Sequence, residues 1–161
     1  MKMKKFLTLG LAAIMAVSMV GCVNQHPEEA NGTAASSDDV RIVATSPATA
    51  DICDRLELDL VGVCSSTLST IPERYKDVTQ IGTAMSPDLE ILKSLKPDYV
   101  LSPSSLQSDL QPKYESIGVN SIFLNLKSVE GMYASISDLG QKFDREEQAQ
   151  ALVDEFNAFM E

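Results

Sequence analysis

Short apolar runs alternate with helix signals along most of this chain, and this alternation constrains the fold more than any other feature. The run at 41–44 is typical of a buried strand, and Thr45-Ser46-Pro47 then supplies a helix cap with proline at the first helical position. The strand signal returns at 60–63, weakly at 81–82, at 99–101 and at 122–124. Because strands that alternate with helices form covered parallel sheets, we predict an α/β fold with a parallel sheet and helices on both faces.

The segments between these strands carry helical periodicity. Ser86-Pro87-Asp88 caps a helix with Leu89, Leu92 and Leu95 on one face, and Pro97 ends it. Further helical segments are expected as a short turn at 72–75, at 111–117, at 129–141 and from about residue 144 onward. The last of these has no capping glycine, no basic last turn and no following proline, so we expect Glu161 to lie inside a helix.

The amino-terminal segment has the order of a secretory signal. Lys2, Lys4 and Lys5 precede an apolar run from Phe6 to Val20, which Thr8, Gly10 and Ser18 interrupt and which is too short for a membrane span. The ending Met19-Val20-Gly21-Cys22 resembles a bacterial lipobox, although its first position is more often leucine. That resemblance implies removal of residues 1–21 and lipidation of Cys22, which anchors the protein at the outer face of a membrane. The other interpretation is an ordinary signal peptide with an incidental cysteine.

Residues 22–39 are polar and lack apolar periodicity, so we expect a solvated tether, in which the only histidine, His26, is a spacer residue. Loss of Lys2, Lys4 and Lys5 leaves 10 of the 13 basic residues against 23 acidic ones, a net charge of −13. This charge opposes binding to nucleic acid or to an anionic lipid surface.

Two further cysteines, Cys53 and Cys64, fall in a predicted helix and at a predicted strand end. A disulfide is possible outside the cell, but we expect two small buried thiols.

Hydroxyl side chains are frequent in the loops that follow the predicted strands. These loops cover 45–49, 64–67, 83–86 and 102–105. Ligands of open parallel sheets bind at this edge, and helix starts there favour anions because their N–H groups are unpaired. The same residue types also cap helices, and for Ser46 and Ser86 we expect capping.

Three stretches resemble the ABC-transporter substrate-binding proteins that handle iron complexes, cobalamin and heme. They are RIVATSPATADICDRLELDLVGV at 41–63, IGTAMSPDLEILKSLKPDYVLS at 81–102 and SVEGMYASISDLGQKFDREEQAQALVDEF at 128–156. Members have two α/β lobes joined by one long helix, with the ligand between the lobes. The resemblance implies an amino-terminal lobe at 40–143 and the truncated start of the interlobe helix at 144–161.

Within this family the chain is similar to the heme receptor lipoproteins of the iron-regulated surface determinant type. The likeness rests on YKDV at 75–78, IGTAMSPD at 81–88, GM at 131–132 and LGQKFDR at 139–145. It implies that Met85 ligates heme iron and that a histidine of the second lobe takes the other axial position. A soft thioether suits such a site, although methionine more often fills a core.

The resemblance also implies the remaining site residues. It places the heme propionates near Ala48 and 65–67, at loops that serine and threonine line. The expected ligand pocket is Thr45, Ser46, Ala48, Ser65, Ser66, Thr67 and Ser104. In cobalamin-type and siderophore-type members an exposed glutamate on each lobe docks with the permease, and Glu90 matches the one on the first lobe. The alternative is that Glu90 has a purely structural role, in which its carboxylate stabilises the first turn of a helix.

No enzyme motif occurs in the sequence: there is no G-x-S-x-G, no phosphate-loop glycine pattern and no set of paired Cys or His ligands. We therefore expect a lipid-anchored, non-enzymatic component of an ABC importer that binds heme and delivers it to the permease. A ferric siderophore or cobalamin is the alternative ligand. A single-lobe surface interaction or sensor module is an alternative of another class.

Overall fold

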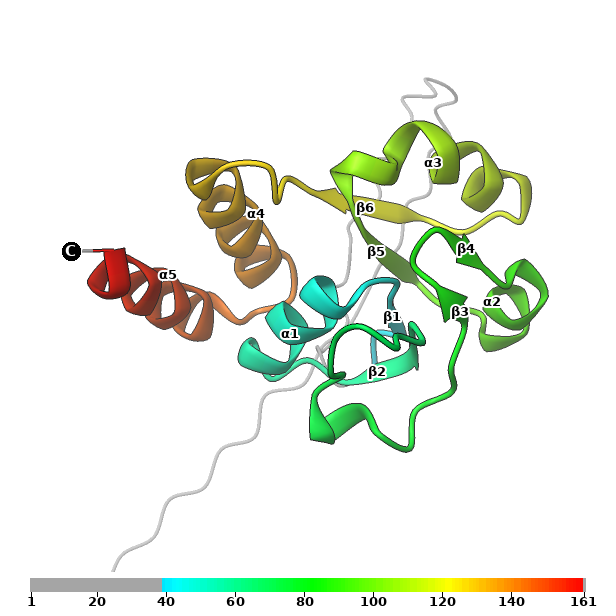
Figure 1. The fold of residues 1–161 in the computed structure, drawn as a ribbon, viewed down its shortest axis with the longest axis horizontal. Coiled ribbons are helices and arrows are strands. Elements are labelled where there is room, and N and C mark those ends of the chain that lie inside the picture. Colours follow the sequence, from blue (N-terminus) through cyan, green and yellow to red (C-terminus); the bar gives the residue numbers. More distant parts are fainter. Residues whose placement is uncertain (1–38, 161) are drawn as a thin grey trace, which may run out of the picture. The chain divides into compact units, whose positions relative to one another are not determined.

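The computed structural model describes residues 39–160, and every structural statement below concerns those residues. The predicted signal peptide, Cys22 and His26 lie outside them, as does the predicted tether apart from Asp39. Helices and strands alternate along most of the chain from Ile42 to Met160, and the described part ends in two successive helices (Figure 1).

A four-stranded parallel sheet forms the centre of the fold. Its spatial order is β2-β1-β5-β6, and each neighbouring pair is parallel. The strands are β1 (Ile42–Ala44), β2 (Leu60–Val63), β5 (Tyr99–Pro103) and β6 (Ser121–Leu124). The prediction of a parallel α/β sheet is confirmed for these four strands.

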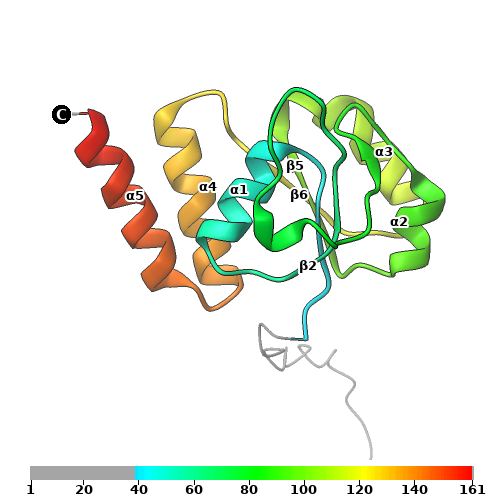
Figure 2. The ribbon, with the colours of Figure 1, turned by 60° about the horizontal axis from the view of Figure 1, so that its bottom comes forward.

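Helices cover both faces of the sheet, as predicted. Ile42 and Ala44 contribute to one buried cluster and Val43, between them, to another, because successive side chains of a strand point to opposite faces. One face carries α1 (Pro47–Arg55), α4 (Val129–Lys142) and α5 (Glu146–Met160); the other carries α2 (Leu89–Leu95) and α3 (Gln107–Ser116). Figure 2 shows the first three helices on one side of the sheet and the last two on the other.

Helix α1 begins as its sequence predicts. The Ser46 hydroxyl accepts a hydrogen bond from the Thr49 N–H at 3.1 Å, and the Thr49 hydroxyl accepts one from the Ser46 N–H at 3.0 Å. This reciprocal pair is a capping box, and Pro47 occupies the first helical position. The prediction that Ser46 is a cap is confirmed.

Helix α2 is capped by Asp88, whose carboxylate accepts hydrogen bonds from the Glu90 and Ile91 N–H groups at 3.0 Å each. The prediction that Ser86 caps this helix is wrong. Ser86 lies two residues before the N-cap position and belongs to a strand. Asp88 occupies the N-cap position and binds the free N–H groups of the first helical turn.

The weak strand predicted at 81–82 does not join the main sheet. Strands β3 (Gly82–Thr83) and β4 (Ser86–Pro87) instead form a separate antiparallel hairpin. A single bridge between Val63 and Gln80 links the segment before it to the edge of the main sheet. Gly82 explains the departure, because its φ of +90° interrupts the extended conformation.

Helix α3 begins at Gln107, four residues before the predicted start at Gln111. It continues from a 3₁₀ turn, η2 (Ser104–Leu106), and its N-cap residue makes no side-chain hydrogen bond. The sequence therefore holds no capping signal for this start. A second 3₁₀ turn, η1 (Glu73–Tyr75), matches the short helical turn expected at 72–75.

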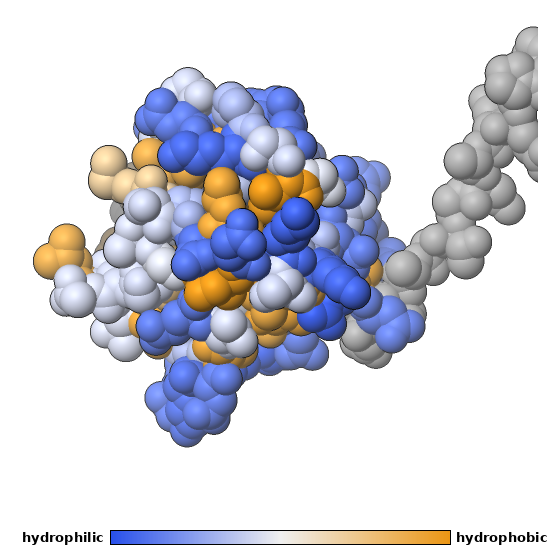
Figure 3. Space-filling model, turned by 90° about the vertical axis from the view of Figure 1, so that its right-hand side faces the viewer, coloured by the Kyte–Doolittle hydropathy of each residue, from blue (hydrophilic) through white to orange (hydrophobic). Residues whose placement is uncertain are grey.

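The surface over α2 and α3 is mainly hydrophilic. Figure 3 looks onto this side, and apolar groups emerge there as separate patches among hydrophilic ones. Within residues 39–160 no helix has the length and apolar character that a membrane crossing requires.

Candidate functional site

The loops that follow β1 and β2 and the β3–β4 hairpin are joined by backbone hydrogen bonds at one edge of the sheet. The Thr45 N–H donates to the Leu101 carbonyl at 3.0 Å, and the Cys64 N–H donates to the Ala44 carbonyl at 3.0 Å. The Ser65 N–H donates to the Gly82 carbonyl at 2.8 Å, which ties the hairpin to the end of β2. The predicted site residues of these two loops and of the hairpin therefore lie on connected backbone at the carboxyl ends of the strands.

A row of buried hydroxyl groups lies beneath this edge. The Thr45 hydroxyl donates to the Leu101 carbonyl at 3.1 Å and lies 2.7 Å from the Ser102 hydroxyl, which lies 3.1 Å from the Tyr114 hydroxyl. Since each hydroxyl has one proton, the donation runs from Tyr114 to Ser102 to Thr45 to Leu101. Burial raises the pKa of Tyr114, so the phenol keeps its proton.

This row corrects the predicted role of Thr45. Its side chain is fully buried and its hydroxyl is used inside the protein, so no ligand can touch it in this structure. Ser46 is 5% exposed and its hydroxyl caps α1. Both residues shape the site from below rather than line it.

Ala48 differs from these two because it is exposed. At the start of α1, Pro47 has no N–H, while the N–H groups of Thr49 and Ala50 donate to the Ser46 hydroxyl and carbonyl. The Ala48 N–H is thus the amide of this first turn that stays available to an anion.

The loop after β2 presents hydroxyl groups. Ser66 holds the loop, since its hydroxyl accepts hydrogen bonds from the Leu68 and Ser69 N–H groups at 3.3 and 3.0 Å. Ser65 is half-buried and Thr67 exposed, and neither hydroxyl has a hydrogen-bond partner among residues 39–160. Leu68, beside them, is 97% exposed.

Met85 lies at the turn of the β3–β4 hairpin and is 76% exposed. Beside it the Ser86 N–H donates to the Thr83 hydroxyl at 3.3 Å, which closes the turn. An exposed methionine on an anchored hairpin has no packing role that would explain it. Its thioether is free to meet a ligand.

Two predicted residues lie on neighbouring elements. Ser104 is half-buried at the start of η2, where the chain leaves β5. Glu90 is exposed in the first turn of α2.

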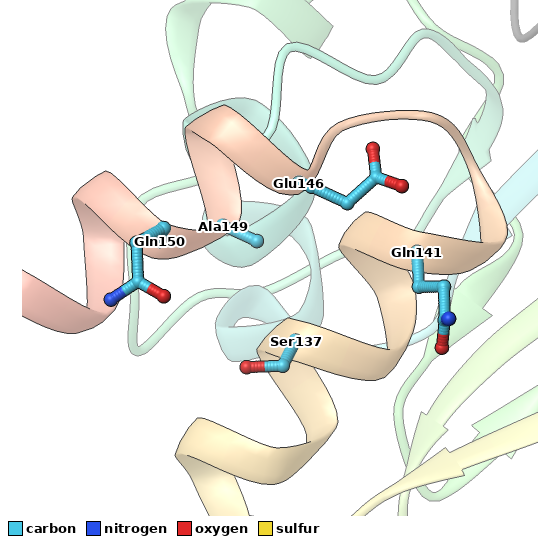
Figure 4. Close-up of a pocket in the computed structure, with 5 residues that line it drawn as sticks. All are labelled: Ser137, Gln141, Glu146, Ala149 and Gln150. Atoms are coloured by element: carbon cyan, nitrogen blue, oxygen red, sulfur yellow. The ribbon is translucent and has the colours of Figure 1, made fainter.

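Two hollows lie elsewhere in the described part of the chain. A half-open one of about 300 Å³ lies between α4 and α5 and is lined by Ser137, Gln141, Glu146, Ala149 and Gln150 (Figure 4). A smaller one of about 70 Å³ lies between β6 and α4. Neither of these two hollows is lined by a predicted site residue.

The described residues bring no three His, Cys, Asp or Glu side chains together as a metal site. Cys53 and Cys64 are both free and buried, as expected. Burial raises the pKa of the Cys53 thiol to about 12 and that of Cys64 to about 11. Of the possible soft ligands on this edge, the thioether of Met85 is therefore the accessible one.

Tyr114 and Gly82 contribute to the site without being among the residues predicted from the sequence. Tyr114 lies on α3, far along the chain from the loops that it supports, and only the fold brings it to Ser102. Gly82 could have been noticed, because a glycine beside a turn often marks a positive φ.

Comparison with known proteins identifies the family. Residues 42–161 match the model of the family Peripla_BP_2, described as periplasmic binding protein. The chain belongs to this family. The members of this family are substrate-binding transport proteins rather than enzymes. The α/β fold of the family agrees with the parallel sheet and the covering helices of this chain.

The curated relatives that the chain matches are longer than the chain itself. It is 37% identical over 158 residues to the high-affinity heme uptake system protein IsdE of Staphylococcus aureus, with 98% of this chain and 52% of IsdE covered. The chain thus spans about half the length of the curated relatives it matches.

Two solved structures share both fold and sequence with the chain. An ABC transporter substrate-binding protein from Listeria monocytogenes EGD-e is 43% identical with a TM-score of 0.72, over 74% of this chain and 46% of that protein. IsdE of S. aureus complexed with heme is 41% identical with a TM-score of 0.71, over the same shares.

Proposed function

We propose that this protein is a substrate-binding component of an ABC importer that captures heme outside the membrane and delivers it to the permease. The observation that carries the proposal is the exposed thioether of Met85 on a hairpin anchored at the ligand edge of the sheet. The similarity to IsdE, a heme uptake protein, supports the choice of heme. In this role the protein catalyses no reaction and binds no nucleic acid.

Met85 would supply one axial ligand to the heme iron. A thioether and a neutral imidazole together complete a hexacoordinate heme, and a thioether alone leaves one position open. The described residues contain no histidine, so we propose that the second ligand is a histidine from a second lobe beyond residue 161.

The heme propionates would bind at the two loops beside the hairpin. The Ala48 N–H and the hydroxyls of Ser65 and Thr67 are available donors there, and the Ser66 hydroxyl keeps the second loop in shape. Ser104 lies at the neighbouring strand end. Thr45 and Ser46 would make no contact with heme, because both are buried and their hydroxyls bind other groups of the protein.

The remaining parts of the proposal concern location and docking. Cys22, which lies outside the described residues, would carry the lipid anchor at the extracytoplasmic face of the cell membrane. Residues 22–39 would then be the tether, and α5 the start of a helix joining two lobes. The exposed carboxylate of Glu90 would contact the permease.

A ferric siderophore is the competing ligand, and the thioether argues against it. Siderophores surround ferric iron with their own hard oxygen donors, so their iron has little use for a soft sulfur ligand. Solved siderophore-binding proteins share this fold at about 20% sequence identity. Similarity at this level supports the fold and gives no support to a siderophore as the ligand.

Titration of the purified natural protein with ferric heme, and separately with a ferric siderophore and with cobalamin, decides between these ligands. We expect a saturable Soret band with heme and weak or no binding of the other two. Saturable binding of a siderophore or cobalamin with no heme complex would reject heme as the ligand, and binding of none of them would favour a surface interaction or sensor module.

A further inference from the structure

The hairpin that presents Met85 depends on an unusual backbone conformation at Gly82. The φ angle of Gly82 is +90°, in a region that residues with a side chain rarely adopt. Among residues 82–87 no other residue has a positive φ. The hairpin therefore requires glycine at its first position for conformational reasons.

The space around Gly82 imposes the same requirement. A Cβ atom there would lie 2.9 Å from the Ser86 carbonyl oxygen and 3.3 Å from the Asp88 backbone nitrogen. Both are backbone atoms, so no side-chain rotation can make room for the new carbon. A residue larger than glycine must push β4 away from β3.

The base of the hairpin is held firmly, so such a displacement has to appear at its tip. Ile81 is fully buried, and its carbonyl accepts a hydrogen bond from the Asp88 N–H at 2.7 Å. The Gly82 carbonyl accepts one from the Ser65 N–H at 2.8 Å. The tip, by contrast, is closed by the 3.3 Å hydrogen bond between Thr83 and Ser86, and Met85 lies within it.

We propose that Gly82 is a positioning residue that holds the Met85 thioether in place at the ligand edge of the sheet. It touches no ligand itself and acts through Met85 alone. The part of this inference that concerns iron rests on the proposed function, whereas the part that concerns the place of Met85 does not.

The test compares Gly82→Ala with Gly118→Ala in the natural protein. Gly118 also has a positive φ, of +72°, but a Cβ there meets nothing within 4 Å. Both substitutions place alanine in a strained conformation, so we expect both to lower Tm, on the order of 5 °C for Gly118→Ala and by more for Gly82→Ala, whose Cβ also meets backbone atoms. They differ in their effect on the hairpin.

The first readout needs no ligand: the ¹³C-methyl NMR signal of Met85, assigned by its disappearance in Met85→Leu. We expect it to shift in Gly82→Ala and to stay in place in Gly118→Ala. The second readout is the ferric heme complex. There we expect Gly82→Ala to weaken the absorption signature of methionine-ligated heme and to lower heme affinity about tenfold or more, while Gly118→Ala matches the unaltered protein.

Identical behaviour of the two variants in both readouts would overturn the positioning role. Failure of the unaltered protein to bind heme would instead reject the proposed function, and the methyl signal would still decide the role of Gly82. Should Gly82→Ala not fold, Thr83→Val takes its place. Thr83 is exposed, and its hydroxyl accepts the hydrogen bond that closes the turn, so the valine variant removes that bond without disturbing the core. An unchanged Met85 signal in that variant would also count against the proposal.

Discussion

Thr45 and Ser102 lie side by side below the ligand edge, with 2.7 Å between their hydroxyl oxygens. The contact joins the residue after β1 to β5, and Tyr114 extends it to α3. Polar groups buried to this degree are costly unless every one of them has a partner. The row therefore fixes the relative positions of two strand ends on which the site is built.

Replacement of Thr45 by valine should show this cost. The variant keeps the shape of the side chain but leaves the buried Ser102 hydroxyl without its acceptor, so we expect the free energy of unfolding to fall by about 1–3 kcal/mol. Thr45→Ser is the matched control, because it retains the hydroxyl and loses one methyl group. Urea denaturation of both checks the prediction, which is contradicted if the valine variant is at least as stable as the serine variant.

Alkaline pH should destabilise the fold through Cys53. Its pKa is raised from 9.0 to about 12, so the folded protein holds the thiol proton in a range where the unfolded chain releases it. Stability is therefore unaffected by this group below about pH 9 and falls above it, by about 1.4 kcal/mol per pH unit.

Comparison with Cys53→Ala isolates this contribution. We expect the difference in unfolding free energy between the unaltered protein and the variant to be constant below pH 9 and to shrink above it. The matched variant Cys64→Ala should show the same trend over a narrower range, since the pKa of Cys64 is raised to about 11. Parallel stability curves up to pH 11 would show that burial does not hold the thiol proton.

Substitution of Glu90 by alanine should separate ligand binding from transport. Glu90 is exposed on α2, on an element other than the hairpin and the propionate loops, so we expect unchanged heme affinity. Uptake should fall if the carboxylate contacts the permease. Glu115→Ala, which removes an exposed carboxylate of α3, is the control and should transport normally. A normal uptake rate with Glu90→Ala would remove the docking role.

Loss of Cys22 should release the protein without affecting its ligand. If the thiol carries the lipid anchor, Cys22→Ala moves the protein from the membrane fraction to the medium and lowers uptake, because the anchor raises the local concentration near the permease. The heme affinity of the released protein should equal that of the anchored one. Retention of Cys22→Ala in the membrane fraction would argue for another mode of attachment.

Much of the fold follows from local sequence patterns. The apolar runs predict the four strands of the main sheet, and Ser46-Pro47 predicts the start of α1, because strand burial and helix capping both depend on nearby residues. The start of α3 could not be predicted in this way. It grows from a 3₁₀ turn without a side-chain cap, so nothing in the sequence marks it.

The site is harder to predict because exposure and pairing are properties of the whole fold. Thr45 and Thr67 both follow strands and both carry a hydroxyl, yet Thr45 is buried against Ser102 and Thr67 is exposed. Their difference arises from packing between β1, β5 and α3. Likewise, the segment expected to be a strand at 81–82 forms part of a hairpin, because the positive φ of Gly82 allows the chain to approach β4 closely. This close approach depends on the position of β4, which the local sequence does not reveal.

The absorption spectrum of the ferric heme complex with and without Met85 tests the central claim most directly. Met160 provides the control, since it is 68% exposed but lies on α5. We predict that Met85→Ala loses the methionine-ligated signature and binds heme at least tenfold more weakly, whereas Met160→Ala is indistinguishable from the unaltered protein. A Met85→Ala complex with an unchanged spectrum and unchanged affinity would contradict the assignment of Met85 as the iron ligand.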